Sequence, residues 1–116
     1  MTPPNLLAYL TTDPCNAAAI ETLAAKEQLA LEIVEPRDLP RLEREHADIV
    51  LDYDFLPPDD RARLLDSDAV RVVALHGYNL DDGLANFLPR RGVLCRRRLD
   101  DRFVQALTAA ARSRAA

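Results

Sequence analysis

Five short apolar runs alternate with helical patterns along the chain, and this alternation constrains the fold more than any other feature. The runs span Asn5–Thr11, Leu29–Val34, Ile49–Asp54, Val70–Leu75 and Val93–Arg97. They are continuous apolar stretches without strict alternation of polar residues, which is typical of strands covered on both faces. Strands separated by helices imply right-handed βαβ units and a parallel sheet. The sequence therefore predicts an α/β fold.

Helix signals fill the intervals between the apolar runs. Asp13 followed by Pro14 supplies an N-cap and a proline at the first helical position, and this helix should reach about Gln28. A last helix should begin after a cap at Asp100 or Asp101. The other predicted helices lie at Leu39–His46, Pro58–Leu65 and Leu80–Leu88.

Length and composition set the class of protein. The 116 residues fit one domain, residues 1–116, and a content of 48% hydrophobic and 29% charged residues supports a buried core. No apolar run is long enough to span a membrane, and no basic segment precedes an apolar one as in a signal peptide, so we expect a cytoplasmic location. Cys15 and Cys95 stand far apart, which predicts reduced structural thiols and no zinc site.

Charge is distributed unevenly along the chain. Residues 1–83 carry 17 acidic and 7 basic residues, a balance of −10, whereas residues 84–116 carry 2 acidic and 8 basic residues, a balance of +6. Such asymmetry can mark an interaction face. The net charge of −4 argues against nonspecific nucleic-acid binding, which needs a broad basic surface.

Acidic residues gather around the third predicted strand, in the segment Asp48–Pro58. Asp52 and Asp54 follow the apolar run and precede two prolines. Because ligands bind at the carboxyl ends of strands in open α/β sheets, a site would lie here. Asp48, Asp52 and Asp54 can hold a cation together, or can equally be solvated or paired with Arg97.

The five βα units resemble the receiver domains of bacterial two-component response regulators, and the resemblance spans almost the whole chain. It implies a single doubly wound, flavodoxin-like (βα)5 domain whose five-stranded parallel sheet has the order 2-1-3-4-5. In that family an acidic pair after the first strand binds Mg²⁺, and an aspartate ending the third strand accepts a phosphoryl group. A serine or threonine ends the fourth strand, and a lysine followed by proline ends the fifth.

The residues at those family positions differ in this chain. Thr11 and Thr12 fall on the acidic pair, and only Asp13 remains acidic there. The acceptor position falls on Asp54, four residues before Pro58 as is usual in the family, or on Asp52, which directly follows the apolar run.

The last two strand ends also depart from the family. His76 replaces the serine or threonine, and the segment Arg97–Asp100 resembles Lys-Pro-Phe-Asp with arginine for both lysine and proline. Phosphoryl transfer depends on a metal ion and a positioned cation, and Mg²⁺ prefers carboxylate oxygens over neutral threonines. Arginine keeps the charge of lysine but not its compact geometry.

These departures favour an atypical, stand-alone receiver-like module that acts through protein–protein interaction without phosphorylation and without a cofactor. Mg²⁺ is the cofactor that a typical receiver domain would bind. The alternative from the same class is a divergent phosphoacceptor that uses Asp54 or Asp52.

A cluster of arginines follows the fourth predicted helix and surrounds the fifth strand. In receivers the face formed by these two elements and the last helix is a common partner or dimer surface, and arginine is enriched at interfaces. The same charges also suit an ordinary solvated edge strand. We therefore expect a protein partner or a homodimer on this face, with no nucleic acid and no membrane. Its candidate residues are Arg90, Arg91, Arg96, Arg97, Arg98 and Arg102.

His76 supports a third hypothesis from another class, because histidine titrates near neutral pH. Paired with Asp13 or Asp54 at the carboxyl edge of the sheet, it could serve a small enzyme as a general base. No serine or cysteine nucleophile motif accompanies it, so it can also be an ordinary hydrogen-bonded histidine at a loop. A deep pocket around these groups would favour the enzyme.

Overall fold

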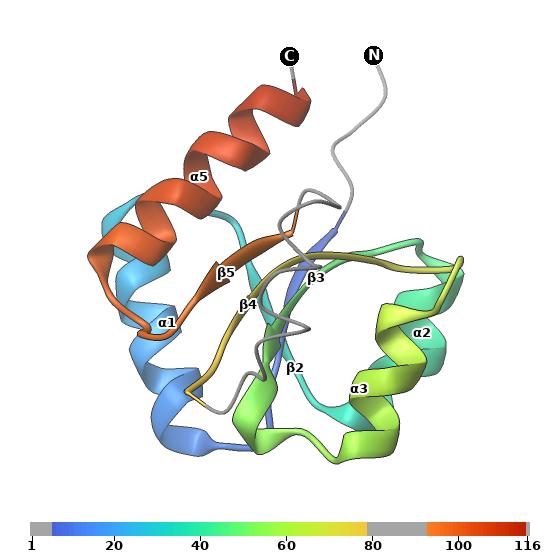
Figure 1. Cartoon of the computed structure of the whole chain (residues 1–116). Coiled ribbons are helices and arrows are strands. Elements are labelled where there is room, and N and C mark those ends of the chain that lie inside the picture. Colours follow the sequence, from blue (N-terminus) through green and yellow to red (C-terminus); the bar gives the residue numbers. More distant parts are fainter. Residues whose placement is uncertain (1–5, 79–92, 116) are drawn as a thin grey trace.

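The computed structural model describes residues 6–78 and 93–115 and contains a five-stranded parallel sheet (Figure 1). The strand order is β2-β1-β3-β4-β5, which is the order that the resemblance in the sequence implies and the order of flavodoxin-like α/β proteins. The strands are β1 (Leu7–Leu10), β2 (Glu32–Val34), β3 (Asp48–Asp52), β4 (Arg71–His76) and β5 (Leu94–Arg96).

The observed strands are shorter than or offset from the predicted ones, for local reasons. The predicted second strand began at Leu29, but the Leu29 N–H donates to the carbonyl of Ala24 (2.8 Å) and still belongs to the end of a helix. The predicted third strand ran to Asp54, but the chain turns into a 3-10 helix, η2 (Tyr53–Phe55), directly after Asp52. Asp52 therefore ends β3, and Asp54 lies in the following turn.

Four α-helices lie in the described part of the chain: α1 (Pro14–Lys26), α2 (Leu39–Arg44), α3 (Pro58–Leu65) and α5 (Asp101–Ala115), with a 3-10 turn, η1 (Pro36–Asp38), before α2. Asp13 caps α1, because its carboxylate accepts from the Asn16 N–H at 3.2 Å. Asp100 caps α5 in the same way through the Phe103 N–H at 3.0 Å, which settles the choice between Asp100 and Asp101. The predicted helix Leu80–Leu88 and the residues Arg90 and Arg91 lie outside the described residues.

Helices cover both faces of the sheet, with α1 and α5 on one face and α2 and α3 on the other (Figure 1). Side chains of β3 alternate between the two cores, since Val50 packs toward α1 and α5 while Ile49 and Leu51 pack toward α2 and α3. All three side chains are fully buried, and burial of each contributes about 1.5–3 kcal/mol. The central strand thus needs apolar residues on both sides, which explains its continuous apolar run.

The structure also bears on the expectations about membrane spans and about the two cysteines. No helix in the described part of the chain is long and apolar enough to cross a membrane. Cys15 and Cys95 are both free thiols. Cys15 is exposed in the first turn of α1, whereas Cys95 is partly buried in β5, where burial raises its pKa.

Candidate functional site

Polar residues from four neighbouring strands form one row at the carboxyl edge of the sheet. The register pairs Asp52 with His76 and His76 with Arg96, and pairs Leu10, just before Thr11, with Leu51. Thr11, Asp52 and His76 are buried, and Arg96 is exposed. The strand ends that the sequence singled out therefore do meet at one edge.

Asp52 is the centre of this row and is 1% exposed. Its Oδ2 accepts hydrogen bonds from Thr11 Oγ1 at 2.6 Å and from Asn16 Nδ2 at 2.9 Å. Its Oδ1 lies 3.7 Å from His76 Nε2. Three elements thus hold this carboxylate inside the protein, and its oxygens face protein donors.

The residues at the expected acidic-pair position have structural roles in the turn between β1 and α1. Thr11 Oγ1 donates to Asp52 and also accepts from the Asp13 N–H at 2.9 Å. Thr12 donates its hydroxyl to the carbonyl of Phe55, which ties this turn to η2. Asp13 is occupied as the cap of α1, where its carboxylate accepts from the Asn16 N–H. The β1–α1 turn is therefore a hydrogen-bonded support for Asp52.

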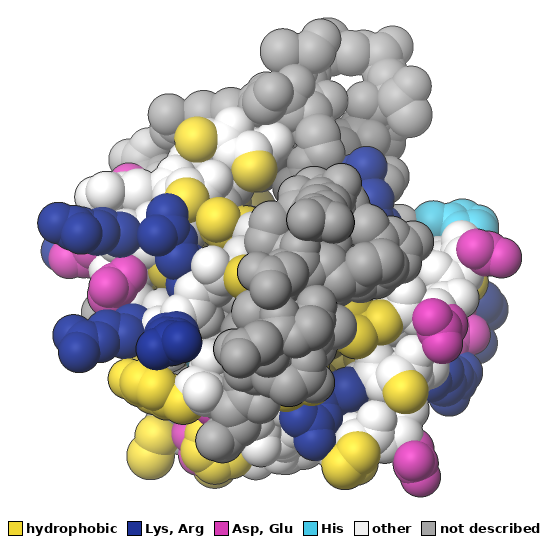
Figure 2. Space-filling view, viewed as in Figure 1, with side chains coloured by type: hydrophobic (Ala, Val, Ile, Leu, Met, Phe, Trp, Pro, Cys, Tyr) yellow, Lys and Arg dark blue, Asp and Glu magenta, His cyan; other side chains and the backbone are white. Residues whose placement is uncertain are grey.

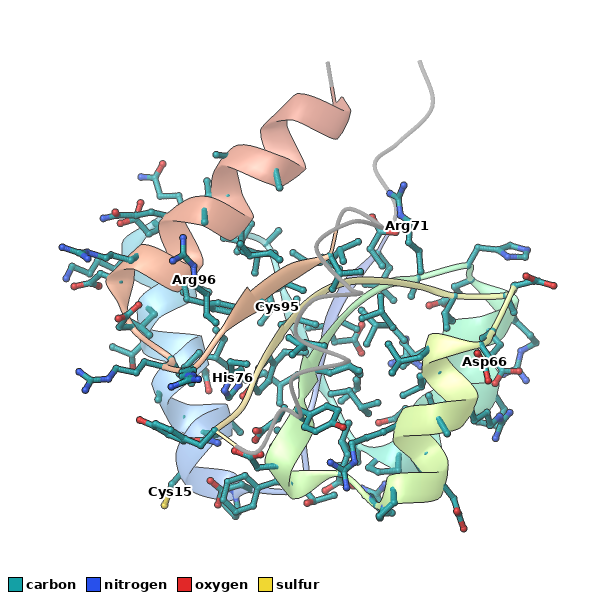
Figure 3. The ribbon with its side chains drawn as sticks, in the orientation of Figure 1. Cys15, Asp66, Arg71, His76, Cys95 and Arg96 are labelled. Carbon is teal, nitrogen blue, oxygen red and sulfur yellow. The ribbon has the colours of Figure 1, made fainter. Side chains whose placement is uncertain are left out.

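His76 ends β4 and is 5% exposed (Figure 3). Its Nε2 shares a hydrogen bond of 2.5 Å with Tyr9 Oη, whose direction depends on the imidazole tautomer. The Tyr9 and His76 rings are parallel, with centroids 5.6 Å apart, and Phe103 of α5 packs edge-on against His76 at the same distance. The imidazole is thus enclosed by a phenol, a phenyl ring and a carboxylate.

Burial controls the titration of this pair. It lowers the pKa of His76, and this effect outweighs the opposite influence of Asp52 and Asp54. Burial also raises the pKa of Tyr9 far above its usual range, and the charges of Asp52 and Asp13 act in the same direction. At neutral pH the imidazole is therefore uncharged and the phenol protonated.

Asp54 is half-buried and shapes the turn that follows β4. Its Oδ2 accepts from the Tyr78 N–H at 2.7 Å. A Cβ added at Gly77 would stand 3.0 Å from Tyr53 Cβ and 3.1 Å from Asp54 Oδ1, so this close approach of backbone and η2 favours glycine. Asp54 therefore binds the backbone of this turn, while its charge also acts on His76.

Asp48 does not join the other two acids. It begins β3, at the opposite end of the strand from Asp52, and both of its oxygens accept from Arg71 at 3.1 Å. Figure 3 shows Arg71 and His76 at opposite ends of β4. The hypothesis that Asp48, Asp52 and Asp54 hold one cation is therefore wrong, and so is a pairing of Asp48 with Arg97.

The exposed arginines lie on β5 and on the connection to α5. Arg96, Arg97, Arg98 and Arg102 are all exposed. Figure 2 shows basic side chains on the side of the molecule where β5 and α5 lie. Arg97 and Arg98 have no acidic partner among the residues that the structure describes. The structure thus places the described members of the predicted arginine face together on the surface.

A cavity of about 440 Å³ opens at the carboxyl edge between these groups. It is lined by Asn16, Asp52, Asp54, Phe55, His76, Tyr78, Arg97, Arg98, Leu99 and Asp100. This is the crevice above the strand ends where open α/β sheets bind ligands. The edge is therefore hollowed, with a buried polar floor and exposed arginines at its side.

The residues do not fit the Mg²⁺ site that the receiver resemblance implies. Thr11 and Thr12 are neutral, and the carboxylate of Asp52 is directed at protein donors. Over residues 6–78 and 93–115, no group of three or more His, Cys, Asp or Glu residues is placed to hold a metal ion.

Three residues of the cluster were not singled out from the sequence, namely Tyr9, Asn16 and Phe103. Tyr9 could have been found from the sequence, because it lies two residues before Thr11 and so points to the same side of the strand. Its hydroxyl also needs a hydrogen-bond partner when it is buried. Asn16 lies in the first turn of α1, which starts at the carboxyl edge. Phe103 looked like any other apolar residue of the last helix.

Comparison with known proteins adds no family to this description. No protein-family model matches the sequence, and neither a curated protein nor a solved structure is significantly similar to it.

Proposed function

We propose that this chain is an atypical receiver-like signalling module that acts in the cytoplasm through protein–protein interaction and is not phosphorylated. The proposal includes a doubly wound (βα)5 domain, with a fifth helix at the predicted position Leu80–Leu88. The sheet order and the helices on both faces support this architecture.

The observation that carries the proposal is the burial of Asp52. A phosphoacceptor must present a carboxylate oxygen to the phosphodonor in line with the leaving group. Asp52 ends β3 at the acceptor position but is 1% exposed, and Thr11 and Asn16 occupy its Oδ2. The cation and the metal ligands that would neutralise a transferred phosphoryl group are also replaced, by Arg97, Thr11 and Thr12.

Incubation with Mg²⁺ and acetyl phosphate should leave the intact mass of the protein unchanged. The physical reason is that the strand-end carboxylate of Asp52 is 1% exposed and accepts hydrogen bonds from Thr11 and Asn16, while neutral threonines stand where the family has metal ligands. A phosphoryl adduct that disappears in Asp52→Asn or Asp54→Asn would contradict the proposal and establish the divergent phosphoacceptor instead. The same two variants show which aspartate is modified.

Charge reversal of Arg97 and Arg98 to glutamate should weaken a complex with a protein partner, or a homodimer, by roughly tenfold or more, because buried charged contacts at interfaces cost at least 1.4 kcal/mol when lost. Both residues are exposed, so the fold should be unaffected. Arg44→Glu, at an exposed position on α2, is the matched control and should change little. Equal association of all variants in analytical ultracentrifugation would remove this face from the proposal.

A small enzyme remains a second candidate, because Asp52 and His76 both line the cavity and stand 3.7 Å apart. The geometry differs from the expected pairing of His76 with Asp13 or Asp54. His76 Nε2 is engaged by Tyr9, and its lowered pKa makes it a weak base. An activity that is lost in His76→Gln but retained in the exposed-site variant His46→Gln would favour the enzyme.

A further inference from the structure

We infer that the carboxyl-edge cavity is a binding site for a small aromatic monocarboxylate. The inference goes beyond the proposed function, since a module that only contacts another protein needs no such cavity. It rests on the size of the cavity, its apolar side chains and the state of its charged groups.

The size and position of the cavity suit a small organic molecule. Its volume of about 440 Å³ lies within the range of roughly 300–1,000 Å³ that is usual for ligand pockets. Loops after β3, β4 and β5 and the first turn of α1 contribute to the lining. Four separate segments thus converge on one volume.

Two aromatic side chains stand exposed at this cavity. Phe55 is 49% exposed and Tyr78 is 68% exposed, and they are the large hydrophobic residues that the structure leaves open among the described residues. Both line the cavity, together with the partly buried Leu99. Exposed aromatic rings beside a pocket favour a flat apolar partner, because stacked or edge-on aromatic pairs contribute about 0.5–1.5 kcal/mol beyond burial.

The acidic groups of the lining are engaged within the protein. Asp52 accepts from Thr11 and Asn16, and Asp54 accepts from the Tyr78 N–H. Asp100 accepts from the Phe103 N–H as the cap of α5. These carboxylates therefore have internal partners and need no cation from a ligand.

The basic groups that line the cavity, unlike the acidic ones, are not engaged by acidic groups of the described residues. Arg97 and Arg98 are exposed, and within the described ranges no carboxylate forms an ion pair with either of them. A guanidinium binds a carboxylate through two parallel hydrogen bonds, which gives both energy and orientation. The guanidinium groups of Arg97 and Arg98 can therefore donate hydrogen bonds to the carboxylate of a ligand in the cavity.

The total charge of the lining disfavours a phosphate more strongly than a carboxylate. Asp52, Asp54 and Asp100 against Arg97 and Arg98 give a formal charge of −1, with His76 neutral. A phosphate group carries about −1.5 to −2 at pH 7 and would meet more repulsion from the three acids than a carboxylate of charge −1. The exposed guanidinium groups of Arg97 and Arg98, together with the rings of Phe55 and Tyr78, favour an aromatic ring bearing one carboxylate.

The test is a titration of the full chain with benzoate, phenylacetate, salicylate and indole-3-acetate, followed by two-dimensional NMR of the backbone amides. At least one of these should bind saturably and shift amides of the cavity lining. Acetate, which lacks the ring, and benzyl alcohol, which lacks the charge, should each bind at least about tenfold more weakly. Inorganic phosphate should bind more weakly than the aromatic acid.

The double variant Arg97→Gln/Arg98→Gln should weaken the best aromatic acid by about tenfold or more, since it removes charge-assisted hydrogen bonds. The matched control Arg96→Gln/Arg102→Gln removes two exposed arginines that do not line the cavity and should change the affinity less than about twofold. Phe55→Ala should weaken binding of the aromatic acid without affecting acetate.

Three outcomes would overturn the inference: no saturable binding by any of the four acids, equal weakening in the control pair, or tighter binding of phosphate than of the aromatic acids. None of these results bears on whether acetyl phosphate modifies the protein. The inference and the proposed function therefore fail in distinguishable ways.

Discussion

Replacement of Asp52 by alanine should lower the free energy of unfolding by about 2–3 kcal/mol. The change removes the acceptor of Thr11 Oγ1 and Asn16 Nδ2, and a buried donor left without its partner costs about 1–3 kcal/mol. The alanine variant no longer buries a charge, which stabilises it relative to the unmodified protein. This gain is small, because the donors around Asp52 already offset much of the desolvation of its carboxylate. Urea unfolding followed by circular dichroism measures the difference.

Asp52→Asn is the informative partner variant. The asparagine carbonyl can accept from both Thr11 and Asn16, so most of the lost stability should return. Asp59→Ala, at an exposed acid of α3, is the control and should stay within about 0.5 kcal/mol of the unmodified protein. If Asp52→Ala is instead as stable as the unmodified protein or more stable, Asp52 is a strained functional carboxylate and its structural role is refuted.

Acidification should destabilise the protein through His76 before most carboxylates titrate. Burial lowers the pKa of His76 in the folded state, whereas the unfolded chain keeps the ordinary value of 6.5. Between these two values the unfolded state binds more protons, so stability rises with pH. The contribution is therefore fully present above about pH 6.5 and is lost as the pH falls through the folded-state pKa. One such group changes stability by at most about 1.4 kcal/mol per pH unit.

The chain has two histidines, and the second supplies the control. His46 is exposed and its Nδ1 lies 3.1 Å from the carbonyl of Ala69. His46→Gln should keep the loss of stability between pH 7 and pH 5.5, and His76→Gln should flatten it. NMR titration of the two imidazoles checks the assignment directly. A folded-state pKa of His76 above the ordinary value of 6.5 would show that the charge of Asp52 dominates over burial.

The parallel sheet was predictable because it depends on patterns that are local in sequence, whereas its strand order was expected from the resemblance to receiver domains. Continuous apolar runs such as Ile49–Leu51 need two covered faces, and the pair Asp13-Pro14 marks a helix start. Once five βα units are recognised, right-handed crossovers leave few strand orders, and these place the carboxyl ends of the strands at one edge. Thr11, Asp52 and His76 each follow or end a strand, and the structure places all three at this edge.

The burial and the hydrogen-bond partners of those side chains were not predictable, because they depend on contacts between distant segments. Burial of Asp52 comes from Asn16 of α1 and from Thr11, which follows β1, and the environment of His76 comes from Tyr9 and Phe103. The pairing of Asp48 with Arg71 follows from the two residues lying opposite each other where β3 and β4 begin. A sequence shows that acids are present, but the register and the packing decide which of them remain open.

The arrangement gives the carboxyl edge two layers with different properties. The inner layer of Tyr9, Thr11, Asp52 and His76 is buried and hydrogen-bonded within the protein. The outer layer holds exposed arginines and aromatic rings around the cavity. Under our account the inner layer stabilises the fold, and recognition of partners or ligands belongs to the outer layer.

Carboxyl footprinting tests the central claim, that Asp52 is a buried structural group, most directly. The native protein would be treated with a water-soluble carbodiimide and glycine ethyl ester, and each aspartate analysed by peptide mass spectrometry over time. Asp59, which is exposed, sets the rate for an open carboxylate, and the urea-unfolded protein sets the intrinsic rate for Asp52. We predict that Asp52 is modified at least about tenfold more slowly than Asp59 in the native protein, and equally fast after unfolding. Labelling of native Asp52 at the rate of Asp59 would contradict the account, because an open strand-end carboxylate is what a phosphoacceptor requires.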